Sequence, residues 1–527
     1  MSGSKSILNP SQYPSILAID QGTSGTTTLV LDFSEPSSPK VLGRSTVSFP
    51  QHYPQENWVE HDLEEIWASV VRSCTEALRE ASYTKERSKK PGPLSISAIG
   101  LTNQRETVCF YDRKTLKPLR KAIVWQCKRS IKTCEDLKKK NLEPFFRERT
   151  GLFLDPYFSG TKLSWVLQNE PELRKKIESG SALIGTVDTY LLSRLTGGLS
   201  YGTEPSNASR TLLFNIRSGN WDPELLERLS ITPTIALPKV QESASLFGTC
   251  KGLTFLNDGI PITGILGDQQ AALAGQRCFS PGEAKCTYGT GAFLLLNIGD
   301  KAVISEQALL TTVAWTFQSK TDYALEGSCF IAGASIQFIR DNLSLLSHSE
   351  ESEALARTAA AAPDLYFVPA LAGLGAPHWE PNARGAILGL TRSTSKAQLT
   401  RATLEGIAFQ VNDLLDCMRE RGQRDLSVLR VDGGAAANSL LLEIQSQLSG
   451  VRVERSALLE TTAFGAGLFS ALGAGIYPDL QALKQAHEPG QNFHPQFELG
   501  QEELRKRQLQ AWERAVAAVK IFSASNA

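Results

Sequence analysis

Residues 15–31 read SILAIDQGTSGTTTLVL, and this pattern is the most informative one for the fold. Residues 15–20 are a short apolar run that ends in an acid, and residues 27–31 are a second run of β-forming side chains. The turn between them is made of glycine and small polar residues. Two β-type runs around a glycine-containing turn predict a β-hairpin at this place.

The same plan recurs far downstream in the chain. Residues 284–288 lead to Gly-Thr-Gly at 289–291, and a strand-like run follows at 292–297. The two hairpins match in plan and not residue by residue. Together they indicate a duplicated fold.

Helical and strand patterns alternate around these hairpins. A helix is expected to begin at Asp62, which would form a capping pair with Glu65. Mixed elements over two halves predict an α/β protein of two domains, because the chain is also longer than one core usually supports. The expected boundaries are a tail at 1–14, a first domain at 15–275 and a second at 276–527. The other expected elements are strands at 96–101, 262–266, 366–369 and 428–431, and helices at about 395–418 and 502–522.

The charge balance argues against some classes of partner. The chain has 527 residues, with 55 Lys and Arg against 55 Asp and Glu, so its formal net charge is zero. A neutral protein is not expected to bind nucleic acid or an anionic membrane by bulk electrostatics. No run approaches the ~20 apolar residues of a membrane-spanning helix, so membrane insertion is not expected. The first residues also lack the apolar core of a signal peptide.

Nine cysteines are scattered along the chain, and no CxxC pair occurs. An odd number without close spacing is typical of a reducing compartment, so a cytoplasmic protein is expected. A zinc site is not expected, because the six histidines lie far from any close cysteine pair.

Four glycine-rich loops lie at residues 20–24, 289–291, 332–335 and 432–438. Glycine lets backbone N–H groups approach phosphate oxygens closely. None of the loops matches GxxxxGK[ST] or GxGxxG, and each alone is typical of an ordinary turn. Four such loops in one chain nevertheless favour a nucleotide-binding protein.

Two acids stand at the ends of predicted strands. Asp20 ends the first strand, where it could be a turn former or could hold Mg²⁺ through water. Asp268 follows the apolar run 262–266, and the carboxyl edge of a buried strand in an α/β protein faces the ligand crevice. The same residue could cap a helix, and both roles are compatible.

Arg105 and Glu106 follow the predicted strand 96–101 as adjacent opposite charges. They could form a surface ion pair, or they could bind a small polyol as donor and acceptor together. Trp125 and Tyr157 lie in the same half of the chain and could wall such a polyol with aromatic faces.

A series of longer runs identifies a family. From about residue 15 to 493, the chain resembles the glycerol kinases of the FGGY family of carbohydrate kinases, which share their nucleotide fold with actin and the heat-shock chaperones. The resemblance implies two actin-like, ribonuclease H-like domains with a ligand cleft between them. The runs that carry it, in chain order, are AIDQGTSGT, NWVEHDLEEIW, GLTNQRET, AIVWQCKR, DPYFSGTK, GTVDTYLL, SNASRTLLFNI, GILGDQQAALAGQ, TYGTGAF, YALEGSCFIAGASIQ, PALAGLGAPHWEPNARGAILGLTR, RATLEGIAFQ and RVDGGAAANSLL.

The resemblance implies ATP-dependent phosphorylation of glycerol, with Mg²⁺ bridging the phosphates and Asp268 as general base. It assigns the acceptor to Arg105, Glu106, Trp125, Tyr157, Asp268, Gln269 and Phe293. It assigns the nucleotide and its phosphates to Thr23, Ser24, Gly25, Thr290, Gly333, Gln337, Gly434 and Asn438. It also implies a homodimer or homotetramer.

Two positions depart from the family pattern. Thr27 stands where familiar glycerol kinases often carry Arg, which would weaken one phosphate contact. Gly259 stands where members inhibited by fructose bisphosphate carry an Arg, and Asp258 adds a negative charge beside it. Losing a cation and gaining an anion disfavours phosphate, so insensitivity to fructose 1,6-bisphosphate is expected.

Two other functions share the fold class. One is a related kinase that acts on another small polyol or sugar, for which Arg105, Glu106 and Tyr157 would need a different partner. The other is a nucleotide-binding chaperone or filament protein, because fold alone does not decide function. A chaperone or filament protein has no reason to carry Arg105, Glu106 and Tyr157, the residues that the resemblance assigns to the polyol.

Overall fold

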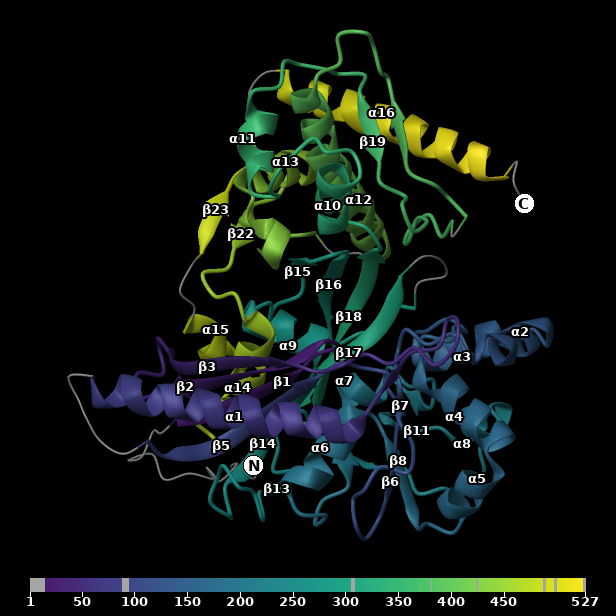
Figure 1. The fold of residues 1–527 in the computed structure, drawn as a ribbon, viewed down its shortest axis with the longest axis vertical. Helices are drawn as coiled ribbons and strands as arrows, with labels where there is room; N and C mark the ends of the chain where they lie inside the picture. The colour runs from purple at the N-terminus through teal and green to yellow at the C-terminus, as the bar shows by residue number, and fades with distance from the viewer. Residues whose placement is uncertain are drawn as a thin grey trace.

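The structure is a computed structural model that describes residues 15–87, 94–304, 309–380, 382–422, 425–486, 490–496 and 500–524. The tail expected at residues 1–14 lies outside the described residues. Two large sheets, one in each half of the chain, lie one above the other in Figure 1, with helices packed around them.

The first sheet contains the hairpin expected at residues 15–31. β1 and β2 pair antiparallel, with Asp20 opposite Thr27, so this prediction is confirmed. β5 and β14 continue the sheet beyond β1 as parallel strands. The strands are, in spatial order, β13 (Gly248–Thr249), β14 (Pro261–Gly267), β5 (Ile96–Asn103), β1 (Ser15–Gln21), β2 (Gly25–Asp32) and β3 (Lys40–Ser48).

The second sheet repeats this order. The hairpin of β15 and β16 is antiparallel, and β21 and β22 follow β15 as parallel strands, as β5 and β14 follow β1. The duplication expected from the two Gly/Thr hairpins is therefore confirmed. The strands are β17 (Leu310–Phe317), β18 (Lys320–Cys329), β16 (Ala292–Gly299), β15 (Glu283–Tyr288), β21 (Val428–Asp432), β22 (Val453–Arg455) and β23 (Gln491–Phe493).

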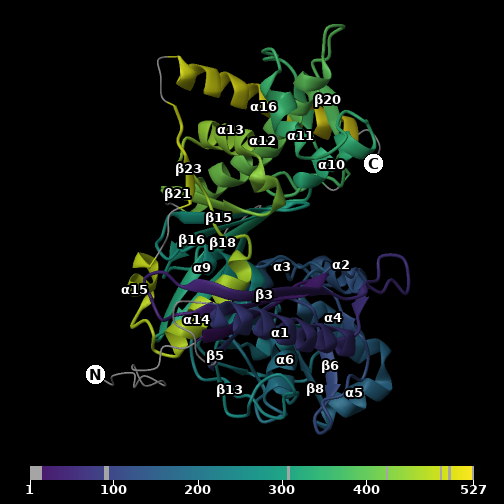
Figure 2. The same cartoon turned by 60° about the vertical axis from the view of Figure 1, so that its left-hand side comes forward.

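Helix α1 (Leu63–Glu86) covers one face of the first sheet (Figure 2). Its buried stripe includes Ile66, Val70 and Cys74, which recur at helical spacing. Asp62 caps it as expected, since the side chain accepts a hydrogen bond from the Glu64 N–H at 2.9 Å. The predicted capping pair with Glu65 is wrong, because the Glu65 carboxylate pairs with His52 at 2.8 Å instead.

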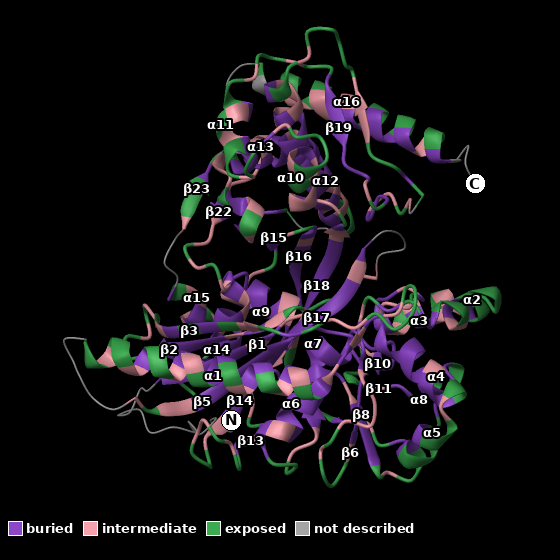
Figure 3. Ribbon diagram, in the orientation of Figure 1, coloured by how far each residue is buried: buried purple, intermediate pink, exposed green. Residues whose placement is uncertain are grey.

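Helix α14 (Thr461–Gly473) belongs to the second half of the chain but packs on the first sheet. Glycines make this close approach necessary. A Cβ on Gly100 of β5 would lie 2.3 Å from the Ala466 carbonyl oxygen, and one on Gly264 of β14 would lie 2.4 Å from the Ser470 nitrogen. The two halves therefore share a core, and Figure 3 shows both sheets and α14 largely buried. The boundary at residue 276 stays a prediction.

The other helices are placed on both halves. Four of them lie above the second sheet in the upper part of Figure 1: α10 (Gly333–Asp341), α12 (Lys396–Gly422), α13 (Ser439–Ser449) and α16 (Gln501–Ala524). A group beside the first sheet comprises α2 (Ile131–Lys139), α3 (Glu143–Thr150), α4 (Ser159–Asn169), α5 (Pro171–Glu178), α6 (Val187–Leu195), α7 (Pro205–Ala208) and α8 (Pro223–Arg228). The rest are α9 (Asp268–Gly275), η1 (Gly434–Ala437), α11 (Glu351–Arg357) and α15 (Leu480–Gln485).

Short strand pairs complete the fold: β4 (Glu60–His61) with β7 (Ala122–Ile123), β6 (Cys109–Asp112) with β8 (Ala182–Gly185), β9 (Gly202–Thr203) with β12 (Lys239–Val240), β10 (Phe214–Asn215) with β11 (Asn220–Trp221), and β19 (Tyr366–Val368) with β20 (Ala386–Leu388). All nine cysteines are free thiols, and eight are buried. Within the described ranges, no helix has the length and apolarity to span a bilayer.

Candidate active site

The charged residues singled out in the sequence meet at one edge of the first sheet. Arg105 and Glu106 follow β5, and Asp268 begins α9 directly after β14. β5 and β14 are parallel neighbours, with Gly267 paired to Asn103, so their carboxyl ends lie side by side. Gly267 makes room for this meeting, because a Cβ there would lie 2.6 Å from Cδ of Arg105.

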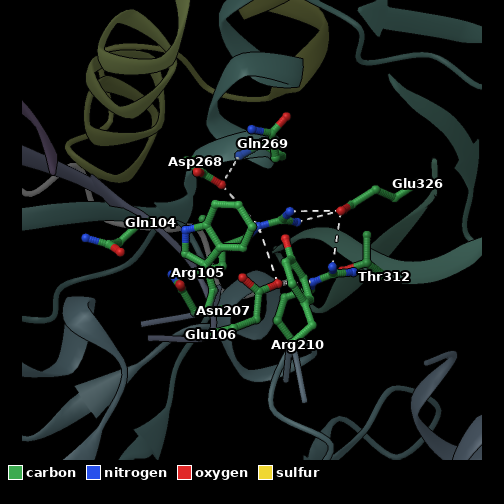
Figure 4. Close-up of polar contacts among 12 residues, drawn as sticks. Gln104, Arg105, Glu106, Asn207, Arg210, Asp268, Gln269, Thr312 and Glu326 are labelled. Atoms are coloured by element: carbon green, nitrogen blue, oxygen red, sulfur yellow. Dashed lines mark hydrogen bonds and ion pairs between the residues drawn. The ribbon is translucent and has the colours of Figure 1, made fainter. Parts of the chain in front are cut away.

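Arg105 is the centre of the cluster in Figure 4. Its Nη1 donates to Oε2 of Glu326 at 2.7 Å and to Oε1 of Gln270 at 3.1 Å. Its Nη2 donates to Oε1 of Glu326 at 2.9 Å. Its Nε lies 3.1 Å from Oδ1 of Asp268. Arg105 therefore joins the general-base candidate to a carboxylate from β18 of the second sheet.

Glu106 is held by a second arginine. Nε of Arg210 lies 2.7 Å from Oε1 of Glu106, and Nη2 of Arg210 lies 3.1 Å from Oε1 of Glu326. The backbone of Glu106 has φ of 61°, which lies in the left-handed region that residues other than glycine rarely adopt. Strained backbone of this kind is typical of functional sites, where the surrounding contacts hold it in place.

The carboxylates of the cluster differ in the direction in which their pKa values are shifted. Burial raises the pKa of Asp268, although Arg105 opposes the rise. Burial also raises the pKa of Glu106 against the effect of Arg105 and Arg210. Burial would raise the pKa of Glu326 as well, but the same two arginines lower it to about 2. Glu326 is thus an anion at neutral pH, whereas Asp268 is a partly exposed carboxylate whose pKa is raised.

Aromatic side chains lie beside the cluster, where the ring centroid of Tyr157 is 5.8 Å from Cζ of Arg210. The rings of Trp125 and Tyr157 meet edge to face with centroids 5.3 Å apart. Nε1 of Trp125 donates to Oγ1 of Thr23 at 3.0 Å, which ties this wall to the first hairpin loop. The buried ammonium of Lys162 donates to the carbonyls of Pro156 and Tyr157, both at 2.5 Å, and so fixes the loop that carries Tyr157.

Three of the four glycine-rich loops meet in the second half. The N–H of Gly333 donates to the Gly289 carbonyl at 3.0 Å, and a Cβ on Gly333 would lie 3.6 Å from Cβ of Ala435. Thr290 is exposed at the tip, and its carbonyl accepts from Ala332 at 2.8 Å. Gly434 is exposed, and no atom of the described residues outside its own chain neighbours lies within 4 Å of where its Cβ would be. The loops thus offer backbone groups and open space together.

Several candidates stand apart from these contacts. The Asn438 side chain caps α13, where it accepts from the Leu441 N–H at 3.0 Å, and it also donates to Ser352 at 3.1 Å. Gln337 is exposed on α10. Phe293, on β16, is partly exposed, and no hydrogen bond, ion pair or ring contact among the described residues joins its side chain to the Arg105 cluster.

The first hairpin loop contacts the residue before Arg105, because Nε2 of Gln104 donates to the Gly22 carbonyl at 3.2 Å. Gly22 donates to the Gly25 carbonyl at 2.9 Å, which closes the turn and leaves Ser24 exposed. The hydroxyl of Thr27 lies 3.0 Å from that of Thr46, so this departure from the family pattern is used within the sheet.

Asp20 is the candidate for holding a divalent cation. Burial and the nearby Asp268 carboxylate raise its pKa to about 8. Two carboxylates that repel one another at a strand end are a donor set that fits Mg²⁺. No group of three or more His, Cys, Asp or Glu among the described residues could hold a metal by itself. Protein carboxylates would therefore supply one or two ligands only.

Four members of the cluster were missed by sequence reasoning: Arg210, Gln270, Lys285 and Glu326. Each lies in a run quoted for the family resemblance or beside one, yet none was assigned a role. An acid in the middle of the apolar strand YALEGSC was the available signal for Glu326. Lys285 on β15 donates to Oε1 of Gln269, and it is fully buried.

The duplicated sheets, with a buried charged cluster at the ends of β5 and β14, define a two-domain protein of the actin-like fold. Residues 15–275 match the N-terminal domain of the FGGY family of carbohydrate kinases, and residues 284–474 match the C-terminal domain. The chain belongs to this family.

Curated relatives cover nearly the whole chain. A glycerol kinase of Myxococcus xanthus is 48% identical over 503 residues, which is 95% of this chain and 98% of the relative. One of Bdellovibrio bacteriovorus is 48% identical over 505 residues, which is 96% and 99% respectively.

Solved structures agree on the architecture. The structure of Plasmodium falciparum glycerol kinase with ADP superposes with a TM-score of 0.89 at 35% identity, over 96% of this chain and 98% of that one. A gluconate kinase from Lactobacillus acidophilus has a TM-score of 0.85 at 19% identity, over 98% and 100%, and shows the fold alone.

Proposed function

We propose that this protein transfers the γ-phosphoryl group of ATP to a primary hydroxyl of glycerol, giving sn-glycerol 3-phosphate and ADP. The observation that carries the proposal is the convergence of the neighbours Arg105 and Glu106 with Asp268, which lies far from them in the chain, in a protein 48% identical to a glycerol kinase. A small triol fits such a cluster because it needs donors and acceptors on opposite sides of each hydroxyl.

The acceptor would bind between charged and aromatic side chains. Nε of Arg105 and Oδ1 of Asp268 are 3.1 Å apart, so a hydroxyl beside them could accept from the first and donate to the second. Arg210 engages Oε1 of Glu106, so we assign Oε2 of Glu106 to another hydroxyl. Tyr157 would bind the polyol through its hydroxyl, and Trp125 and Phe293 would cover its carbon chain.

Asp268 would act as the general base. Its carboxylate accepts the proton of the primary hydroxyl while that oxygen forms a bond to the γ-phosphorus and the bond to the ADP oxygen breaks. A raised pKa makes this carboxylate a better base than an ordinary aspartate. Gln269 would orient the acceptor, with its own side chain held by Lys285. Positioning supplies most of the catalysis in such transfers.

The nucleotide would lie against the glycine-rich loops of the second half. Backbone N–H groups can approach phosphates closely where no Cβ intervenes. The proposed contacts are Thr290, Gly333, Gln337, Gly434 and Asn438, with Thr23, Ser24 and Gly25 of the first hairpin near the transferred group. Asp20 fits the role of holding Mg²⁺ through water. When bound, the ion offsets negative charge on the phosphates.

An ADP-release assay with and without glycerol tests the proposal. We expect turnover that depends on glycerol, and a higher kcat/KM for glycerol than for dihydroxyacetone, xylulose or erythritol. ADP release that does not change when glycerol is added would contradict the proposal and favour a chaperone-like or filament-forming protein. A higher kcat/KM for another polyol would show that this member of the family is a kinase of that polyol and not of glycerol. Size-exclusion chromatography of the same sample tests the expected homodimer or homotetramer, and fractionation of the source cells tests the cytoplasmic location.

A further inference from the structure

Within the described residues, the hydrogen bonds of the Arg105 guanidinium are made by Nη1 and Nη2, while Nε lies beside the Asp268 carboxylate as an ion pair. Glu326 and Gln270 take three of its five N–H groups through Nη1 and Nη2. Nε is buried and has no hydrogen-bond acceptor among the described residues, although Asp268 lies 3.1 Å away. The edge made by Nε and the outer N–H of Nη2 is therefore the edge that remains for a ligand. A planar fork of this kind suits two neighbouring oxygens.

Glu326 supplies the contact that sets this orientation. It projects from β18 of the second sheet, and its side chain is only 5% exposed. One carboxylate spans both arginines, since it bonds Arg105 through two atoms and reaches Nη2 of Arg210 at 3.1 Å. Arg210 in turn holds Glu106. Figure 4 shows Glu326 on the far side of both guanidinium groups from Glu106.

The charges within this buried set balance. Arg105 and Arg210 carry two positive charges, and Glu106 and Glu326 carry two negative ones. If the charge of Glu326 is removed, the guanidinium of Arg105 has Asp268 and Glu106 as its remaining anions nearby. Nε of Arg105 already lies 3.1 Å from Oδ1 of Asp268, and attraction in a buried site is strong, so the Nη groups released by Glu326 would also turn toward these two anions. That turn would consume both the ligand edge and the carboxylate of the general base.

We propose that Glu326 is a positioning residue of the acceptor site, which holds the Nε edge of Arg105 toward the polyol and, through Arg210, holds Glu106. The proposal rests on the proposed function. Because Glu326 belongs to the second sheet, binding of the acceptor by the first half depends on a side chain of the nucleotide half. Nothing in this assignment requires Glu326 to touch the acceptor.

Steady-state kinetics of Glu326→Gln test the proposal. Glutamine keeps the volume but loses the charge. We expect the glycerol KM to rise on the order of 10- to 100-fold while the ATP KM changes less than about twofold, because charge-assisted hydrogen bonds hold only the acceptor side. Glu326→Asp keeps the charge but is one methylene too short for both arginines. It should fold normally and give a glycerol KM between those of the wild type and Glu326→Gln.

Glu283→Gln is the matched control. Glu283 is another buried glutamate of the second sheet, and it pairs with Arg430 and Lys484 at 3.4 and 3.0 Å. Its removal should leave both KM values unchanged, even if the melting temperature falls. Melting temperatures of all variants separate loss of folded protein from loss of affinity. If Glu326→Gln does not fold, the glycerol KM of Glu326→Asp decides.

Three outcomes would overturn the proposal. The first is an unchanged glycerol KM in a folded Glu326 variant, the second is an equal rise in both KM values, and the third is a rise of the glycerol KM in Glu283→Gln as large as in Glu326→Gln. Failure of the proposed function looks different, because the wild type itself would then show no turnover with glycerol. If the wild type prefers another polyol, the same comparison is made with the KM for that polyol.

Discussion

The proposed acceptor site and the proposed nucleotide site consist of different chemical groups. Buried charged side chains such as Arg105, Arg210 and Glu326 make up the first, and each is at most 5% exposed. Backbone groups around Gly289, Gly333 and Gly434 make up the second, where tips are exposed and side chains are small. One site is thus defined by side-chain chemistry, and the other by the absence of side chains.

This difference assigns specificity and affinity to different regions. A buried arginine or carboxylate left without its partner by the wrong ligand is costly, so a side-chain site discriminates between similar small molecules. Backbone N–H groups bind phosphates of many ligands in the same way. We therefore expect substitutions in the cluster to change which acceptor is used, and substitutions in the loops to change how tightly the nucleotide binds.

The largest effect is expected for Asp268→Asn. Loss of the base should lower kcat by a factor on the order of 10² or more, because asparagine cannot accept the proton. Glycerol binding and the melting temperature should change little, since the side chain keeps its size. Kinetics and a glycerol titration of the variant check this. Near-normal turnover would show that another group is the base.

A smaller effect is expected for Gly434→Val in the nucleotide region. Nothing lies within 4 Å of the added Cβ, so the melting temperature should stay the same. The side chain would enter the space assigned to the nucleotide and raise the ATP KM about tenfold, with no change in the glycerol KM. Ala437→Val, at the exposed end of the same short helix η1, is the control. An equal rise of the glycerol KM would break the separation between the two regions.

Acid should weaken the cluster through Glu326. Its pKa lies at about 2 in the folded protein, below the 4.5 of an ordinary glutamate, so its ionised form stabilises the fold. This contribution is complete above about pH 4.5 and is lost as the pH falls toward 2. Urea unfolding should show the wild type more stable than Glu326→Gln at neutral pH, with the difference shrinking in that window. A difference that does not depend on pH would contradict this account of the ion pairs.

The smallest effect is expected with fructose 1,6-bisphosphate. In the loop before β14, Oδ1 of Asp258 accepts from the Gly252 N–H at 2.7 Å, and Gly259 adopts φ of 92°. Both positions are exposed, and neither provides a cation for a phosphate. We expect no inhibition at physiological concentrations of the effector. Inhibition in the ADP-release assay would show that a phosphate site lies elsewhere on this half of the protein.

Sequence patterns predicted the fold and part of the charged cluster around Arg105. Both hairpins, the strands that follow them and the helices at 396–422 and 501–524 lie where periodicity and turn residues placed them. Arg105 and Asp268 could be found because each follows a recognisable strand. The pairing of Glu326 with Arg105 and Arg210 could not be predicted, because these partners are more than a hundred residues away and only the packing of β18 against the first half brings them together. The crossing of α14 onto the first sheet was hidden for the same reason.

A crystal structure with glycerol and a non-hydrolysable ATP analogue would test most directly whether Asp268 and Arg105 hold the acceptor hydroxyl opposite ATP. We expect one terminal hydroxyl oxygen of glycerol to lie within about 3 Å of both the Asp268 carboxylate and Nε of Arg105, and to face the γ-phosphate. Glycerol bound away from this cluster, with Asp268 turned from the nucleotide, would contradict this expectation.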